Sequence, residues 1–363
     1  MGISNLNKFL RGKCPDVFEP INLTDLSYFK GAVDISLYVF KYKTIFGDMW
    51  LNALMSLLMC FRQNDIHVCF IYDTSAPEEK NEERARRKEH KEKIENRVME
   101  LSIALDKAKL TGEIDPILIE FGESIATKNQ KTLPKSLLRV SKQVELKTDL
   151  KTIEYEILRK QNQAIGVTKD DFVMSKRLLD MTGIPWFDAI AEAETTCSDL
   201  CIRNKVDVVF SEDTDVMCYG APLFITKINT ADNTAVLIKH TNVLEQLGLT
   251  KDQFTDFCIM CGTDYNKNIP KIGPEKAYKL IKEFINIDGI AASGIDVTIL
   301  NHVRVREIFK EYVHKDVDVS YCKQPNIQEL VEFIIKNHIK TNIERVKKIF
   351  DSKELEIEIF DDE

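Results

Sequence analysis

The stretch VVFSEDTDVMCYG at 208–220 combines the two features on which the fold depends. With the two residues before it, its apolar start forms the run VDVVFS at 206–211, which is typical of a short buried strand. Two carboxylates, Asp213 and Asp215, follow directly where this strand is expected to end. The stretch therefore predicts a buried strand whose carboxyl end carries acidic residues.

Three more apolar runs of the same kind lie upstream: GAVDI at 31–35, HVCFIY at 67–72 and GIPWF at 183–187. Helical patterns over about 47–63, 170–182 and 192–204 lie between these runs. Strands that alternate with helices predict an α/β fold. Its central sheet should be mostly parallel and twisted, with helices on both faces.

A long charged segment at 78–168 interrupts this alternation and predicts a helical insertion. Its first part, KNEERARRKEHKEK at 80–93, has seven Lys or Arg against four Glu. Its later part, from Pro134, has the spaced apolar residues of an amphipathic helix. After residue 240 only helices are expected. We predict one domain at 1–350, with the regions 1–77, 78–168, 169–240 and 241–350, and an acidic tail at 351–363.

The composition bounds the class of protein. The 363 residues are 44% hydrophobic and 30% charged, which excludes a disordered or fibrous chain. The net charge of −8 argues against a nucleic-acid partner if only the total is considered. The tail at 351–363, however, has seven acidic residues and one Lys and so contributes −6 of that total. The rest of the chain is thus nearly neutral, and the placement of its charges matters more than their sum.

Nine cysteines are scattered through apolar runs, which predicts free, buried thiols in a reducing compartment. Cys258 and Cys261 have zinc-like spacing, but no second Cys or His pair accompanies them, so we expect a structural role. The chain starts without the apolar core of a signal peptide, and its apolar stretches look shorter than a membrane span. These features predict an intracellular, soluble protein with no membrane partner.

Acidic residues recur at the ends of the predicted strands and at neighbouring helix ends. The seven are Asp34, Asp73, Glu192, Glu194, Asp213, Asp215 and Asp264. Taken singly, an Asp at a strand end is more often a helix cap or a turn residue than a ligand. Taken together, the seven point to one site, because ligands of an open parallel sheet bind beyond the carboxyl ends of its strands.

Seven carboxylates in one place require positive charge. Two unit charges about 4 Å apart already repel by roughly 4 kcal/mol at an effective dielectric near 20. Oxygen ligands without His or Cys favour a hard cation, so Mg²⁺ is expected and Mn²⁺ can substitute. Two such ions would hold a phosphodiester, activate a water on one side and stabilise the leaving oxygen on the other.

A second signal is NIPKIGPEKAYKLI at 268–281. Gly273 is expected in a turn conformation, and Pro274 suits the first position of the helix that follows. The free N–H groups of that helix start would accept a phosphate, with Lys271 and Lys276 adding positive charge. This pattern predicts a helix-hairpin-helix grip on duplex DNA. The alternative is a tight connection without a ligand.

These segments resemble the structure-specific 5′ nucleases, and among them the flap endonucleases of DNA replication and repair. The similarity runs from the start to about residue 350. It rests on MGISNL, VDISLYVFKY, FIYDTSAPEEK, GIPWFDAIAEAETTC, VVFSEDTDVMCYG, LGLTKDQFTDFCIMCGTDYNKNIPKIGPEKAYKLI and QPNIQELVEFI. The resemblance implies a PIN-like nuclease fold. The insertion at 78–168 would form a helical arch, and 262–284 a helix-two-turn-helix motif that holds duplex DNA, often with a K⁺ ion.

The resemblance also implies roles for single residues. The family's metal-binding acids fall on the same seven carboxylates, with Asp34, Asp73, Glu192 and Glu194 mainly at one ion and Asp213, Asp215 and Asp264 at the other. Its catalytic basic pair matches Lys80 and Arg87, which would stabilise charge on the scissile phosphate. Gly2 matches the N-terminal glycine near the active site, where little room for a side chain is expected. Phe40 matches the aromatic that stacks on a substrate base, although its own context, VFKYK, is more typical of a core residue.

Three features depart from the family pattern. Asp73 and Glu192 are 119 positions apart, which implies an enlarged arch or connection. The helix before the second strand reads SLLMCF instead of carrying basic residues, and Arg62, Lys41 and Lys43 are candidate substitutes. The tail has neither a basic extension nor the family's clamp-docking motif, which leaves binding to a sliding clamp open. The divergent arch and the short tail are compatible with a large DNA virus as the source.

We therefore expect a monomeric, Mg²⁺-dependent 5′ flap endonuclease with 5′–3′ exonuclease activity that cuts branched DNA by two-metal-ion hydrolysis. An exonuclease, or a relative that cuts junctions or bubbles, is the alternative within the family. A non-catalytic DNA-binding scaffold is a second alternative, against which the complete acidic set argues. The compartment would be the nucleus or, for a viral protein, a cytoplasmic replication site.

Overall fold

The computed structural model describes residues 2–132 and 150–351, and the chain divides into two compact units. The larger unit is built from Met1–Lys41, Met49–Glu83 and Thr168–Glu363, and the smaller unit from Tyr42–Asp48 and Arg84–Val167. The predicted region boundaries at 77, 168 and 240 stay predictions. The predicted acidic tail after Asp351, and the part of the predicted insertion helix at 134–149, lie outside the described residues.

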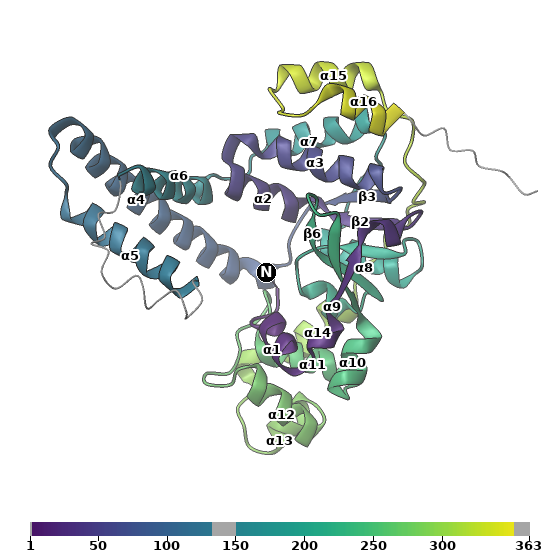
Figure 1. The fold of residues 1–363 in the computed structure, drawn as a ribbon. Coiled ribbons are helices and arrows are strands. Elements are labelled where there is room, and N and C mark those ends of the chain that lie inside the picture. Colours follow the sequence, from purple (N-terminus) through teal and green to yellow (C-terminus); the bar gives the residue numbers. More distant parts are fainter. Residues whose placement is uncertain (1, 133–149, 352–363) are drawn as a thin grey trace, which may run out of the picture. The chain divides into compact units, whose positions relative to one another are not determined.

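Within the described ranges, the larger unit contains a seven-stranded sheet of order β1-β7-β6-β5-β2-β3-β4 (Figure 1). The strands are β1 (Glu19–Asn22), β2 (Lys30–Asp34), β3 (His67–Tyr72), β4 (Trp186–Asp188), β5 (Val208–Phe210), β6 (Leu223–Asn229) and β7 (Thr234–Lys239). Five neighbouring strands of the sheet are parallel: β4, β3, β2, β5 and β6. Strand β7 is antiparallel to both β6 and β1. The predicted mostly parallel sheet is confirmed.

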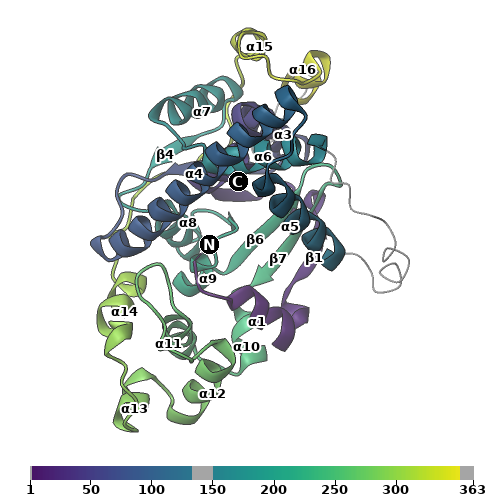
Figure 2. The ribbon, with the colours of Figure 1, turned by 90° about the vertical axis from the view of Figure 1, so that its left-hand side faces the viewer.

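The four predicted strands are present as β2, β3, β4 and β5, and three more strands extend the sheet. Figure 2 shows these three, β6, β7 and β1, side by side. Their side chains are only partly buried, whereas those of β3 and β5 are buried throughout. Strand β7 nevertheless contains four apolar residues in a row, AVLI at 235–238, and β6 contains three, LFI at 223–225, so these two strands were missed although a local signal was present.

Most helices of the described chain belong to the larger unit. They are α1 (Leu6–Lys13), α3 (Trp50–Gln63), α7 (Lys169–Thr182), α8 (Ala193–Ile202), α9 (Asp215–Tyr219), α10 (His240–Leu247), α11 (Lys251–Cys261), α12 (Pro274–Phe284), α13 (Ile287–Ala292), α14 (His302–Lys310), α15 (Ile327–Lys336) and α16 (Ile343–Asp351). Helix α2 (Ile35–Phe46) begins in the larger unit and ends in the smaller one. The predicted helices at 47–63, 170–182 and 192–204 correspond to α3, α7 and α8.

Local sequence signals set the ends of α7. Thr168 and Asp171 form a reciprocal capping box, with the Asp171 N–H donating to Thr168 Oγ1 and the Thr168 N–H donating to Asp171 Oδ2 at 2.7 Å. Gly183 ends the helix with φ 70°, a conformation that glycine adopts without strain. Strand β4 begins three residues after Gly183, at Trp186.

Helices cover both faces of the sheet, as predicted (Figure 1). On one face, α8 packs on β2, β3 and β5, and Ile71 shares a hydrophobic core with Leu200. On the other face, α3 packs on β3, and the ring of Phe61 lies edge-on to that of Phe210 with centroids 4.9 Å apart. Successive side chains of the buried strands therefore pack into cores on opposite faces of the sheet. This packing fixes the register of the strands and so the position of their ends.

One helical stretch corrects the expectation that no apolar run is long enough for a membrane span. Ile35–Gln63 is long and apolar enough to cross a membrane by length and composition. Gly47, with φ 56°, lies in a 3₁₀ turn that separates α2 from α3 within it. In α3, Leu54, Leu57 and Leu58 have no exposed surface. The apolar character of α3 therefore supplies the core beneath the sheet.

The smaller unit is helical in its described residues, in agreement with the predicted insertion. Its helices are α4 (Asn81–Thr111), which begins in the larger unit, α5 (Pro116–Thr132) and α6 (Leu150–Ala164). They enclose a separate small core in which Leu101, Leu118 and Ile153 are almost fully buried. An independent core explains why these residues form a unit of their own.

All nine cysteines are free and buried, as predicted. Cys258 and Cys261 lie in α11 with at most 1% of their surface exposed, among apolar neighbours. This environment agrees with the predicted structural role.

Candidate active site

Three strand ends bring aspartates to one edge of the sheet. Asp34 is the last residue of β2, Asp73 directly follows β3, and Asp213 lies three positions beyond β5. Strand β2 lies between β3 and β5 and is parallel to both. The carboxyl ends of the three strands therefore share one edge, where ligands of such sheets bind.

Two of these aspartates also hold helix starts. Asp34 Oδ1 accepts from the Leu37 N–H at 3.3 Å, in the first turn of α2. Asp73 Oδ1 accepts from the Ala193 N–H at 2.7 Å, at the start of α8. The cap and ligand interpretations are thus compatible, because a carboxylate that caps with one oxygen keeps a second acceptor oxygen.

The start of α8 brings two glutamates to the same edge. Glu192 occupies the N-cap position without capping through its side chain, and Glu194 lies in the first turn. Both are buried, with 6% and 7% of their surface exposed. The bond from Asp73 to Ala193 ties this helix start to the end of β3.

The turn after β5 buries two more acids. The Asp213 N–H donates to Ser211 Oγ, and the Asp215 N–H donates to Asp213 Oδ1, both at 3.0 Å. Asp215 has no exposed surface, and neither of its carboxylate oxygens has a hydrogen-bond partner among the described residues. A buried carboxylate without partners is costly unless a cation or a proton compensates it.

Asp264 completes the set from the segment after α11. It is partly buried, and its charge raises the pKa of both Asp213 and Asp215. Each of the seven acids acts electrostatically on at least one other, and we call them the carboxylate cluster. The structure thus brings together all seven acids that the sequence singled out.

Burial is the main cause of the raised pKa values in the carboxylate cluster, and mutual repulsion is the second. Burial and the charge of Asp73 raise the pKa of Asp34 well above its usual value. Burial and the charge of Glu194 raise the pKa of Asp213 to about 6 and that of Glu192 to about 7. A cation bound among these groups would lower all of these pKa values.

Lys80 brings a positive charge into contact with the carboxylate cluster. Its Nζ lies 2.5 Å from Glu192 Oε1 and 2.9 Å from Glu194 Oε1, and the residue is only 8% exposed. Burial alone would lower the pKa of this ammonium group, but the charges of Glu194 and Glu192 outweigh burial and raise it. Lys80 is therefore a charged, buried partner of the carboxylate cluster rather than part of a solvated helix face.

The donor set of the carboxylate cluster fits a hard cation. All seven side chains offer oxygen, and Asp215 has two oxygens without partners. In the described ranges, no three Asp, Glu, His or Cys side chains converge closely enough to hold one ion directly. Mg²⁺ usually keeps several waters and takes only one or two carboxylates directly, so this spacing suits Mg²⁺ better than an ion that needs an all-protein cage.

Gly2 lies against the carboxylate cluster, where its missing side chain matters. It has φ 77°, and a Cβ atom there would lie 2.7 Å from Asp215 Oδ1 and 2.8 Å from Thr214 Oγ1. The next residue is anchored, because the Ile3 N–H donates to Thr214 Oγ1 at 2.8 Å. This position has no room for a side chain, as expected.

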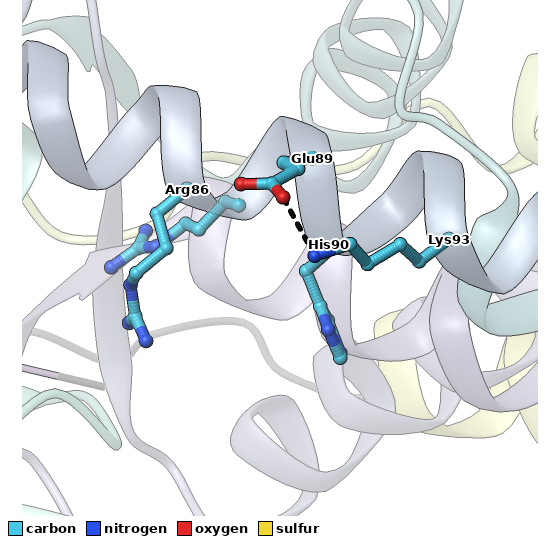
Figure 3. Close-up of a pocket in the computed structure, with 5 residues that line it drawn as sticks. Arg86, Glu89, His90 and Lys93 are labelled. Carbon is cyan, nitrogen blue, oxygen red and sulfur yellow. Dashed lines mark hydrogen bonds and ion pairs between the residues drawn. The ribbon is translucent and has the colours of Figure 1, made fainter.

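Arg87 lies in the smaller unit, exposed on α4. It lines a surface pocket together with Arg86, Glu89, His90 and Lys93. Figure 3 shows these side chains along one stretch of the helix, and Lys93 Nζ pairs with Glu89 Oε1 at 2.6 Å. The structure therefore groups Arg87 with other basic side chains of α4.

Phe40 and the proposed basic substitutes are placed differently from what their sequence context suggested. Phe40 is 51% exposed on α2, so its interpretation as a core residue is wrong. Arg62 is only 5% exposed and Lys43 only 7%, so neither side chain offers an accessible surface contact. Lys41 is more accessible and pairs with Glu212 at 2.5 Å.

The segment at 262–284 forms the turn after α11 and helix α12. Pro274 is the first residue of α12, as predicted, but Gly273 has extended backbone with φ −95° rather than a turn conformation. The left-handed residue of this turn is Lys271, with φ 64°. Lys271 and Lys276 are both exposed, and no atom lies within 4 Å of a Cβ atom built on Gly273. The start of α12 is therefore open to a ligand.

Two tyrosines that the sequence analysis did not single out lie at the carboxylate cluster, one in direct contact with it and the other bonded to the first. Tyr265 Oη donates to Glu192 Oε2 at 2.7 Å, and Tyr219 Oη lies 2.9 Å from Tyr265 Oη. Both belong to quoted motifs, GTDY and VMCYG, but nothing in their spacing revealed that they share a neighbour.

Comparisons with known proteins agree with this geometry. The family model described as the XPG I-region matches residues 183–264, which include five of the seven acids. A probable RAD2-like endonuclease, 076L, of Invertebrate iridescent virus 3 is 33% identical over 366 residues, covering 93% of this chain and 94% of that protein. Flap endonuclease 1 of Meyerozyma guilliermondii is 26% identical, covering 96% of this chain and 90% of that protein.

Solved structures show the same fold. The catalytic core of Rad2 in complex with DNA substrate superposes with a TM-score of 0.64 at 17% identity, covering 97% of this chain and 99% of that chain. Flap endonuclease-1 from Methanococcus jannaschii superposes with a TM-score of 0.60 at 22% identity, covering 93% and 95%. These structures agree in fold, and the 33% identity to the iridescent virus protein over nearly the whole of both chains shows the family: the chain belongs to the RAD2-like, FEN/XPG-type structure-specific 5′ nucleases.

Proposed function

We propose that this nuclease cuts 5′ flaps in branched DNA and also removes nucleotides in the 5′–3′ direction, using two Mg²⁺ ions. The family is generally dependent on divalent metals. The observation that carries the proposal is the buried carboxylate cluster, in which the oxygens of Asp215 have no hydrogen-bond partner among the described residues. Cations bound at the cluster would relieve the repulsion among these acids, and the same cations would hold a phosphodiester.

The residues around the carboxylate cluster support this chemistry. Divalent ions bound there would activate a water for attack and stabilise the leaving oxygen. The Lys80 ammonium group lies beside Glu192 and Glu194, where it can donate to a phosphate oxygen as negative charge develops. Gly2 lies directly against Asp215 and Thr214, and a larger residue there would crowd the carboxylate cluster. Arg87 is proposed as a second basic group on the basis of the family resemblance.

Binding of DNA is proposed at two further places. The N-terminus of α12, with Lys271 and Lys276 exposed beside it, offers free N–H groups and positive charge to duplex phosphates. A K⁺ ion in the turn before α12 is part of the same proposal. The exposed ring of Phe40 suits stacking on an unpaired base.

Cleavage of a 5′-labelled double-flap DNA with Mg²⁺ tests the function. Asp215→Asn keeps the shape of the side chain but removes its charge, and should abolish cleavage. The matched control is Asp256→Asn, because Asp256 is also buried, at 3% exposure, but pairs with Arg306. Folded Asp256→Asn protein should cut at the parent rate. Parent-like cleavage by Asp215→Asn would overturn the proposed mechanism.

A panel of flap, nick, bubble and four-way DNA substrates distinguishes the alternatives. A flap endonuclease cuts near the junction of single and double strand, a pure exonuclease releases mononucleotides from a nick, and a junction-cutting relative prefers the four-way substrate. Binding without cleavage would favour the scaffold alternative. The monomeric state, the absence of a membrane partner and the nuclear or cytoplasmic compartment stay predictions, and binding to a sliding clamp stays open.

A further inference from the structure

A chain of hydrogen bonds runs from Glu192 into the protein interior. Tyr265 Oη donates to Glu192 Oε2 at 2.7 Å, and Tyr219 Oη lies 2.9 Å from Tyr265 Oη. The single proton of the Tyr265 hydroxyl group is used on the carboxylate, so Tyr219 must be the donor to Tyr265. A side-chain hydrogen bond joins Tyr219 to Thr195, two residues after Ala193. The series of hydrogen bonds thus starts at Glu192, the N-cap residue of α8, and returns to the first turn of α8 at Thr195.

Aromatic packing fixes both tyrosine rings. Tyr219 is 1% exposed and Tyr265 is 5% exposed. The ring of Phe309 contacts both of them edge-on, with centroid distances of 4.9 Å to Tyr219 and 5.4 Å to Tyr265. Loss of a hydroxyl group from either tyrosine would therefore leave the ring in place.

The two oxygens of Glu192 face different partners. Oε2 accepts from Tyr265, whereas Oε1 faces the ammonium group of Lys80 at 2.5 Å. Lys80 Nζ also lies 4.9 Å from the centroid of the Tyr265 ring. Tyr265 therefore contacts both members of this buried ion pair, through its hydroxyl group and through its ring face.

We propose that Tyr265 is a positioning residue of this nuclease: it keeps Glu192 Oε1 turned toward bound cations, and Tyr219 fixes the direction of the Tyr265 hydroxyl group. The inference rests on the proposed metal-dependent function. A carboxylate with one oxygen held by a neutral donor presents the other in a single orientation. Without that donor, Glu192 is free to rotate or to turn both oxygens toward Lys80. Partners that orient a ligand in this way typically account for 10- to 100-fold in metal affinity or activity.

The test compares three Tyr→Phe variants by two measurements. Binding of Mn²⁺ is followed by electron paramagnetic resonance without DNA. The Mg²⁺ concentration for half-maximal single-turnover cleavage is then measured on the double-flap substrate. The variants are Tyr265→Phe, Tyr219→Phe and, as matched control, Tyr72→Phe. Tyr72 is 3% exposed, and its hydroxyl group is 2.8 Å from Ser175 Oγ, so the control also loses a buried hydrogen bond.

Tyr265→Phe should weaken Mn²⁺ binding and raise the Mg²⁺ requirement by about 10- to 100-fold, with the limiting rate largely recovered at saturating Mg²⁺. Tyr219→Phe should show a smaller change in the same direction. Tyr72→Phe should lose thermal stability without a change in either metal measurement. If Tyr265→Phe and Tyr219→Phe both bind Mn²⁺ as tightly as Tyr72→Phe, the inference is wrong. A parent protein that neither binds Mn²⁺ nor cuts would instead overturn the proposed function.

Discussion

Replacing Asp213 by Asn removes one charge from the carboxylate cluster and keeps its shape. Asp213 is 8% exposed, and burial first and the charge of Glu194 second raise its pKa from 3.8 to about 6. The amide oxygen of Asn can still accept from the Asp215 N–H, which Asp213 Oδ1 now does at 3.0 Å. We therefore predict that Asp213→Asn is more stable than the parent protein when no divalent ion is present.

The size of this effect follows from the pKa of Asp213. A carboxyl group whose pKa is higher in the folded state destabilises the fold when it is ionised. This loss of stability is complete at a pH above the pKa of the folded state and disappears at a pH below the pKa of the unfolded state. At about 1.36 kcal/mol per pKa unit, a rise from 3.8 to about 6 corresponds to about 3 kcal/mol. Because neighbouring acids share the repulsion, we expect a gain of about 1–3 kcal/mol at pH 8. It should shrink to about half at pH 5.

Urea unfolding in EDTA, followed by tryptophan fluorescence, measures this gain. Both tryptophans, Trp50 and Trp186, belong to the larger unit, so the signal reports on the unit that carries Asp213. Asp256→Asn is the control, and its expected change in the free energy of unfolding has the opposite sign. It removes an acid paired with Arg306 at 2.6 Å and should cost about 1–3 kcal/mol.

Addition of Mg²⁺ should stabilise the parent protein more than Asp213→Asn, because the ion binds the folded carboxylate cluster and removes its repulsion. An Asp213→Asn protein that is no more stable than the parent at pH 8 in EDTA would refute the argument that buried charge strains this site.

Three further predictions follow from buried groups of the larger unit. Gly2→Ala places a methyl group 2.7 Å from Asp215 Oδ1 at a position with φ 77°, so it should slow single-turnover cleavage by about 10- to 100-fold and also lower the thermal stability, and a parent-like rate would contradict this. Lys80→Met leaves Glu192 and Glu194 without their cation and should lower the free energy of unfolding in EDTA by about 3–5 kcal/mol. Mg²⁺ should restore part of this loss, and unchanged urea midpoints would contradict the ion pairing. Ellman's reagent should label nine thiols only after unfolding, since all nine are buried, and immediate labelling of the native protein would show an accessible cysteine.

The sequence predicted the parallel part of the fold because burial on both faces leaves a clear pattern. Runs such as HVCFIY and VDVVFS need apolar residues at successive positions, and they correspond to β3 and β5. Of the three strands that were not predicted, β1 lies at the edge of the sheet and mixes polar with apolar residues. Strands β6 and β7 contain the short apolar runs LFI at 223–225 and AVLI at 235–238 and were missed all the same. The antiparallel pairing of β1 with β7 also joins segments that are far apart in the chain.

The acids of the candidate site were recognisable because each lies at a strand or helix end, and such ends are visible in the local pattern. How each acid is neutralised was not visible. Lys80 lies in a charged run that is typical of a solvated face, yet the fold buries its ammonium group between Glu192 and Glu194. Phe40 shows the reverse case, since an apolar context accompanies a half-exposed ring.

The sequence by itself thus determined which residue types are available: oxygen ligands for a hard cation, buried strands that carry them, and helices on both sides. Only the tertiary structure decided how these residues are paired. Tyr219, Tyr265 and Glu192 are separated by tens of positions, and their hydrogen bonds form because β3, β5, α8 and α11 pack against one another. Local patterns record the burial and chain direction of each segment, whereas hydrogen bonds between distant segments depend on how the whole chain closes its core.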